Sequence, residues 1–118
     1  MSFFPIIELV DRYAIAQLKF DRTQANQEEL DFYNKQIVAI DITKIRAELD
    51  ELYTIHQFIW DLESELKSGV EDQLSLDEIG QRAIEIRNWN NKRIKLKNAI
   101  ADKLGSNVKE IKQDHLSQ

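Results

Sequence analysis

Residues 75–104 read SLDEIGQRAIEIRNWNNKRIKLKNAIADKL, and this stretch decides the fold. Ser75 can cap a helix through its hydroxyl, and Glu78, three residues later, can return a bond to the Ser75 amide. Leu74 and Ile79 can close a hydrophobic staple around this cap. Gly105 follows at the point where a left-handed residue would end the helix. The stretch therefore predicts one long helix between these two signals.

One side of this predicted helix is apolar at both ends and polar in its middle. Steps of four and three residues select that side: Ile79, Ala83, Ile86, Asn90, Arg93, Lys97, Ile100, Leu104. In a bundle the polar middle would face other helices, so its charges would need partners there.

The composition fits one small helical domain. The chain has 118 residues, of which 42% are hydrophobic and 31% charged, with 3 Gly and 1 Pro, so few residues interrupt long helices. The absence of cysteine excludes disulfides and thiolate metal sites. No apolar run approaches the ~18 residues that span a bilayer, and the first residues lack the features of a secretion signal. We therefore expect a cytoplasmic protein with no membrane partner.

The formal charge of −5 is unevenly distributed. Residues 1–81 hold 17 acids and 7 basic residues, which gives −10, whereas residues 82–118 hold 9 basic residues and 4 acids, which gives +5. The basic last helix either is neutralised by acidic helices within the bundle or offers a face to an anion. Nucleic acid is not an expected partner, because the basic residues point in several directions around the helix.

Two shorter helices are predicted before the long ones. Pro5 suits a first helical turn, which predicts a helix over residues 5–22. Asn26 can cap a second helix that has Glu28 and Glu29 in its first turn. The apolar phase slips by two residues at 41–43, which predicts a kink or a new cap.

A third helix is predicted from residue 42 to residues 68–69. Its stripe has spacings of three and four throughout: Ile42, Ile45, Leu49, Leu52, His56, Ile59, Glu63, Leu66. The short loop after it makes this helix and the next antiparallel neighbours, with His56 near Asn90 to within about one turn. The predicted fold is an all-α antiparallel bundle of three to four helices with a long helical hairpin, over residues 1–105, followed by a polar tail over 106–118.

The candidate site is the polar part of the facing stripes. Its counter-charges are sought on the first helix, at Glu8 and Asp11, and on the third, at Glu48 and Glu51. The candidates for ligand binding are Glu8, Asp11, Lys19, His56, Trp60, Glu63, Asn90, Arg93 and Lys97. These residues either form salt-bridged layers that fix helix register or line a pocket where Arg93 and Lys97 bind an anionic group and Asn90 orients it.

The sequence offers little support for metal or cofactor chemistry. Glu48 and Glu51 form a Glu-x-x-Glu pair such as all-helical nucleotide pyrophosphohydrolases use for magnesium. Those enzymes also need an acidic pair on the next helix, where this chain has Asn90, Arg93 and Lys97. No glycine-rich phosphate loop, nucleophile elbow or paired-cysteine motif is present. We therefore expect no metal and no cofactor.

Three stretches resemble a family of short helical proteins of unknown function from marine and other bacteria and from tailed phages. They are residues 8–12 leading to Ile15 and Lys19, residues 60–63, and the segment from Arg82 through residues 90–97 to 104–106. Asn91 stands where the family usually has an acid, and Lys67 where it usually has arginine. The resemblance implies a helical fold and a shared polar set, and it implies no reaction.

Together these features favour a non-enzymatic binding or assembly module. The alternative is an enzyme that binds an anion or phosphate ester in a polar pocket between helices, remotely like the pyrophosphohydrolases. We also expect self-association, because long helices in a short chain leave apolar surface to cover. A protein partner or a small anionic ligand would suit such a module.

Overall fold

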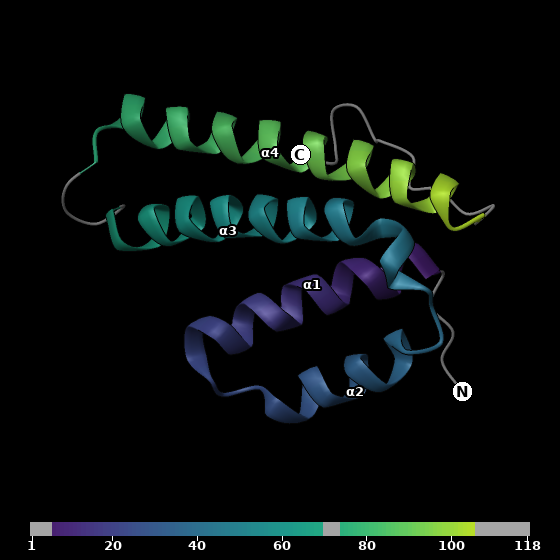
Figure 1. Cartoon of the computed structure of the whole chain (residues 1–118). Helices are drawn as coiled ribbons and strands as arrows, with labels where there is room; N and C mark the ends of the chain where they lie inside the picture. The colour runs from purple at the N-terminus through teal and green to yellow at the C-terminus, as the bar shows by residue number, and fades with distance from the viewer. Residues whose placement is uncertain (1–5, 70–73, 106–118) are drawn as a thin grey trace.

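The computed structural model describes residues 6–69 and 74–105 (Figure 1). The chain over these residues is all-α, as predicted, with no strand among them. Its elements are α1 (Ile6–Thr23), α2 (Gln27–Ile37), the short 3₁₀ helix η1 (Ile42–Ile45), α3 (Arg46–Gly69) and α4 (Leu76–Lys103). The predicted tail over 106–118 and the predicted start at Pro5 lie outside the described residues.

The helices form two hairpins joined through α1. The long hairpin of α3 and α4 lies on one side, and the shorter pair α1 and α2 lies on the other (Figure 1). α1 contacts all three other helices, whereas α2 packs mainly on α1. α1 is therefore the element that can carry side chains to the inner faces of both α3 and α4.

The two ends of α4 form as the sequence predicts. The Ser75 hydroxyl accepts a bond from the Glu78 amide at 3.1 Å, and the Glu78 carboxylate accepts one from the Ser75 amide at 3.0 Å. This capping box satisfies two amides that the first turn would leave unpaired. At the other end Gly105 has a φ of +73°, the left-handed conformation that glycine adopts without steric cost.

Asn26 departs from the prediction. It precedes α2, but its side chain makes no capping bond to the helix backbone. Instead its amide donates to the carbonyl of Ala16 on α1 at 3.2 Å and to the carboxylate of Glu29 at 2.9 Å. The predicted cap is therefore wrong, because the Asn26 side chain is used to hold the turn between α1 and α2 against α1.

The predicted break near residue 42 is confirmed. α2 ends at Ile37, and Asp41 then caps η1 by accepting a bond from the Thr43 amide at 3.2 Å. The new N-terminus starts the α3 stripe in its own phase, so Ile45, Leu49 and Leu52 all face the core and are at most 4% exposed.

The hairpin register agrees with the expected pairing to within one turn. Glu65 pairs with Arg82 at 2.8 Å, and the Phe58 and Trp89 rings stack with centroids 4.6 Å apart. Both contacts join α3 to α4 at positions close to those expected from the facing stripes.

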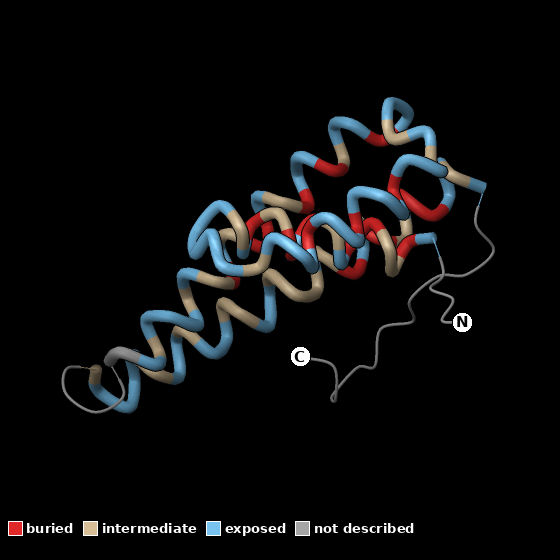
Figure 2. The backbone as a smooth tube through the Cα atoms, turned by 90° about the horizontal axis from the view of Figure 1, so that it is seen from below, coloured by how far each residue is buried: buried red, intermediate tan, exposed pale blue. Residues whose placement is uncertain are grey.

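The core occupies only part of the hairpin's length. The largest buried cluster joins α1, the end of α2, η1 and the parts of α3 and α4 nearest to them: Ile7, Val10, Ala14, Ile37, Ile45, Leu49, Leu52, Ile100, Ala101. Figure 2 shows the buried residues gathered where α1 and α2 lie against the hairpin, and none at the hairpin's far end. No described helix has a stretch apolar enough, over the length a bilayer requires, to cross a membrane.

Candidate functional site

Asp11 lies at the centre of a buried charge network. It projects from α1 toward the hairpin and is 4% exposed. Its Oδ1 is 2.8 Å from His56 Nε2 of α3. Because an ionised carboxylate only accepts hydrogen bonds, Nε2 carries the proton in this contact, and the other ring nitrogen, Nδ1, is the acceptor of the neutral ring. The pair thus fixes the orientation and the tautomer of His56.

Lys97 joins the same network from α4. It is 1% exposed, and its Nζ lies 2.9 Å from Glu8 Oε2 and 3.6 Å from Asp11 Oδ2. A buried ammonium without carboxylate partners would cost several kcal/mol. Of the four acids proposed as counter-charges, α1 therefore supplies the two that neutralise Lys97, one turn apart on the same face.

The charges around Asp11 set its protonation. Burial would raise the pKa of Asp11, but the hydrogen bond from His56 and the positive charges nearby outweigh burial. The largest of these charges in effect is Arg93, and Lys97 adds to it. The pKa of Asp11 therefore lies below its ordinary value of 3.8, and the residue is a carboxylate at neutral pH.

Arg93 is less well satisfied than Lys97. Its Nη1 is 3.7 Å from Asp11 Oδ2, which is a charge contact and too long for a hydrogen bond. Its Nε is buried and has no hydrogen-bond partner among the described residues, although the side chain as a whole is 23% exposed. A guanidinium presents five donors, so Arg93 retains capacity to bind an acceptor.

A hollow of about 210 Å³ opens beside Arg93, between α1, α3 and α4. α1 contributes apolar side chains, α3 contributes both apolar and polar ones, and α4 contributes two polar ones. The lining residues are Ile15, Leu18, His56, Ile59, Trp60, Glu63, Asn90 and Arg93. No hydroxyl or thiol side chain is among them. The hollow thus combines one cation, one carboxylate, one oriented imidazole and one amide with an apolar wall.

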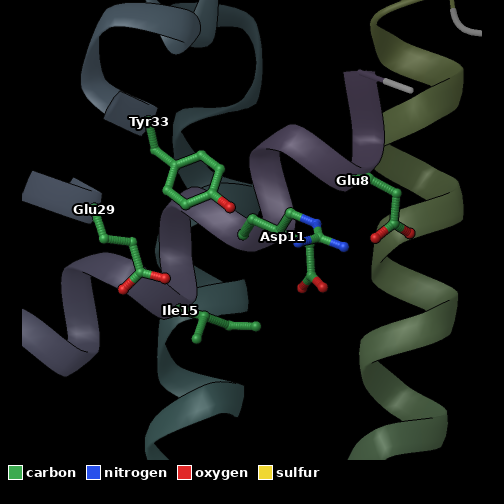
Figure 3. A pocket seen from close by; sticks show the side chains of 6 residues that line it. Glu8, Asp11, Ile15, Glu29 and Tyr33 are labelled. Atoms are coloured by element: carbon green, nitrogen blue, oxygen red, sulfur yellow. The ribbon is translucent and has the colours of Figure 1, made fainter. Parts of the chain in front are cut away.

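A second hollow of about 250 Å³ lies between α1 and α2, and Asp11 is one of its lining residues. Figure 3 shows Tyr33 and Glu29 on the α2 side, Glu8 on the side of α4, and Asp11 between them. Arg12 and Ile15 complete its lining. Three carboxylates in this hollow make it a poor site for an anion, and Glu8 and Glu29 are already paired with Lys97 and Lys19.

The structure brings together eight of the nine candidate residues. The charge network consists of five of them: Glu8, Asp11, His56, Arg93 and Lys97. Trp60, Glu63 and Asn90 lie with His56 and Arg93 around the first hollow. Lys19 lies apart from them, because it pairs with Glu29 of α2 at 3.5 Å. Its two-turn spacing from Asp11 places it on α1 beyond the reach of the network.

Residues that the sequence analysis did not select also line the two hollows. Arg12, Glu29 and Tyr33 lie around the second one, and Ile15 lines both. Tyr33 belongs to the apolar stripe of α2, which signals burial and does not distinguish a pocket wall from a core position. No local pattern marked these residues, because the second hollow depends on how α2 folds back onto α1.

The acidic pair on α3 does not form a metal site with other acids. Glu48 pairs with Lys103 at 2.5 Å, and this contact lowers the pKa of Glu48, while Glu51 is exposed. Within residues 6–69 and 74–105, no three His, Asp or Glu side chains are grouped to hold a metal ion.

Comparison with known proteins adds no relative. No family model, no curated protein and no solved structure matches this chain. The function therefore has to be argued from the geometry of the site.

Proposed function

We propose that this chain is a non-enzymatic binding module that holds a small anionic ligand in the hollow between α1, α3 and α4. The observation that carries the proposal is the state of Arg93, whose buried Nε has no hydrogen-bond partner among the described residues. Buried polar atoms are nearly always satisfied in folded proteins, so Arg93 has unused donor capacity, and its side chain, 23% exposed, lines the open hollow. A carboxylate or phosphate group in the hollow would be a suitable partner for this guanidinium.

Lys97 and Arg93 have different roles in this proposal, although the sequence analysis treated them together. Lys97 is buried under Glu8 and Asp11 and serves to hold α4 against α1. Arg93 contacts Asp11 only at 3.7 Å and lines the hollow. Lys97 therefore supports the interpretation of the polar stripe as a salt-bridged layer. Arg93 supports its interpretation as part of a ligand pocket.

The lining also restricts the ligand. Trp60, Ile59 and Ile15 offer an apolar wall, and a hollow of about 210 Å³ is smaller than the ~300 Å³ at which drug-sized pockets begin. Glu63 lies two helical turns from His56 on α3, about 10 Å away along the axis, and would repel an anion at that end. The preferred ligand is a small organic anion whose charge lies at Arg93 and whose apolar part lies toward Trp60.

A thermal-shift series tests this proposal. The probes are inorganic phosphate, acetate, benzoate and phenyl phosphate, each titrated against the full chain. A ligand that binds only the folded state raises the melting temperature, by an amount equivalent to about 2.7 kcal/mol at a hundred times its dissociation constant. We expect the aromatic anions to stabilise more than acetate or phosphate.

Matched variants locate the binding site. Arg93→Met should abolish the shift and Arg93→Lys should retain part of it, because lysine keeps the charge without the forked donors. Arg82→Met removes an arginine that pairs with Glu65 on the hairpin surface, so it should leave the shift unchanged. The proposal fails if no probe stabilises the wild type, or if Arg93→Met keeps the full shift.

An enzyme acting on an anionic ester is the second candidate function. The hydrogen bond from His56 to Asp11 favours it, because a carboxylate that orients an imidazole is the arrangement used for general-base catalysis. In this scheme Arg93 and Asn90 hold the ester's anionic group, and His56 Nδ1 takes a proton from an attacking water. Hydrolysis of nitrophenyl phosphate would reveal such activity, and its loss in His56→Gln would assign the base. For both candidate functions, the sequence leads us to propose that the protein acts in the cytoplasm.

A further inference from the structure

The first half of α4 carries an uncovered, largely apolar face. Leu76, Gly80, Ala83 and Arg87 follow one another at spacings of four, three and four, so they share one side of the helix, and Ile84 adjoins them. All five are exposed, Leu76 by 87% and Ile84 by 46%. We call these five residues the distal face.

The same side of α4 is covered in its second half. Ile94 and Ala101 continue the line of Ala83 at intervals of three and two turns, and they are 4% and 0% exposed. There α1 contacts α4, and Ala101 belongs to the buried cluster that includes residues of α1. Figure 2 shows that the hairpin extends beyond the other helices, and along that extension no described residue is buried. Among the described residues, no helix covers the distal face in the way that α1 covers the second half of α4.

A hollow adjoins this face. It measures about 400 Å³ and is lined by Leu66 of α3 and by Ala83, Ile84, Ile86 and Arg87 of α4. An apolar side chain from outside would fit it, because four of its five lining residues are apolar. α4 thus carries both an apolar hollow and the exposed Leu76. A partner that presents a leucine like Leu76 could fill the hollow.

We propose that the distal face binds the distal face of a second copy of this chain, with the two α4 helices antiparallel. The charges favour this occupant. Asp77 stands at one end of the face and Arg87 at the other, ten residues or about 15 Å apart. A twofold axis between them brings the arginine of each copy to the aspartate of the other, whereas a parallel pair would place like charges together. A twofold interface is self-complementary in just this way.

Gly80 and Ala83 lie near that axis. Glycine weakens the interior of a helix relative to alanine, and a Cβ at Gly80 would meet nothing within 4 Å in a single chain. Packing within one copy therefore gives no reason for glycine at this position. In the dimer, the two small residues let the α4 backbones approach closely, and Leu76 of each copy enters the hollow of the other. The α3–α4 hairpins of the two copies then pack face to face as a four-helix arrangement, whereas the described residues of one copy alone form only two helices in this region.

Sedimentation equilibrium of the full chain tests the dimer. The wild type should form a species of twice 13.9 kDa. Ile84→Glu should weaken association at least tenfold, because it places a charge in the centre of the interface. Val38→Glu is the matched control, since Val38 is 81% exposed and lies after α2, away from the distal face. A monomeric wild type at the highest soluble concentration, or equal weakening by both variants, would overturn the proposal.

A cross-link tests the geometry independently. The chain has no cysteine, so a single introduced thiol can form a disulfide only with another copy. Under mild oxidation Ala83→Cys should yield a covalent dimer, and Val38→Cys should not. In addition, Arg87→Glu should weaken the dimer and the added change Asp77→Arg should restore it. Failure of Ala83→Cys to cross-link, or failure of the restoration, would contradict the antiparallel arrangement. These residues lie outside the Arg93 hollow, so the anion proposal and the dimer proposal can fail separately.

Discussion

Replacing Asp11 with asparagine should destabilise the fold more than any other single change in the charge network. Asparagine keeps the size of the side chain but removes the charge that lies 2.8 Å from His56 and within 3.7 Å of both Lys97 and Arg93. Lys97 would keep Glu8 as a carboxylate partner in this cluster, and its side chain is 2% exposed. The variant thus leaves buried cationic groups with too little opposite charge.

The expected loss follows from the burial of the pair. Removing one partner of a buried ion pair costs about 3–5 kcal/mol, and we take the lower end, about 3 kcal/mol, because Glu8 still pairs with Lys97. For a domain of this size that loss corresponds to a decrease of roughly 12 °C in melting temperature. Glu8→Gln should cost about 1 kcal/mol or less, because the Glu8 side chain is 32% exposed and solvent screens its charge.

Urea denaturation followed by circular dichroism measures the free energy of unfolding for these variants, and its pH dependence gives a second test. The pKa of Asp11 is lower in the folded state than its ordinary value of 3.8. The Asp11 contribution is therefore complete above that value and is lost as the pH falls through the folded-state pKa. The difference between the wild type and Asp11→Asn should shrink as the pH falls below 3.8.

The reasoning is refuted if Asp11→Asn costs no more than Glu8→Gln at neutral pH. It is also refuted if the difference from the wild type persists unchanged in acid. A double-mutant cycle with Lys97→Met separates the pair from the rest of the network, and we expect the two changes to be clearly non-additive.

Three further predictions concern the helix ends and one tyrosine. Ser75→Ala removes half of the capping box and should cost about 0.5–2 kcal/mol in the free energy of unfolding, measured by urea denaturation against a control at an exposed residue of the same helix, Gln81→Ala. Gly105→Ala should cost about 1–2 kcal/mol because φ is +73°, and a neutral result would show that α4 ends differently in solution. Burial and the hydrogen bond to Asp21 raise the pKa of Tyr53 to about 12 from 10.0, so its stabilising contribution should be complete below pH 10 and be lost as the pH rises toward 12. Ultraviolet titration of the phenolate should detect this, with the late step absent in Tyr53→Phe.

Much of the fold follows from local sequence signals. The capping box at Ser75 and Glu78, the glycine at 105 and the slip of phase near residue 42 all act within a few residues, so the sequence alone locates them. The facing stripes also predict the hairpin register, because spacings of three and four leave one choice of inner face. Asn26 is the exception, since its amide binds the carbonyl of Ala16 on another helix and no local rule anticipates that contact.

The candidate site could be predicted only in part. Periodicity places Asn90, Arg93 and Lys97 on one face, and the cost of burying charge requires acids opposite them. It does not decide which acids, and Glu48 binds Lys103 while Glu8 and Asp11 bind Lys97. Periodicity also cannot predict that Lys97 is buried and paired whereas Arg93 keeps hydrogen-bond donors without a partner. This difference depends on where α1 crosses the hairpin, and that crossing is a property of the tertiary packing.

The contact between Glu8 and Lys97 has a consequence for how the chain folds during synthesis. The two residues are 89 positions apart, whereas Glu65 and Arg82, which join the long hairpin, are 17 apart. Pairs close in sequence form early, and distant pairs wait for the chain that separates them. On the ribosome, α1 emerges before α3 and α4, so Glu8 and Asp11 stay exposed to water until most of α4 has been translated. We therefore expect the two hairpins to form independently and the ionic contact between them to close last, as the step that commits the chain to its native state.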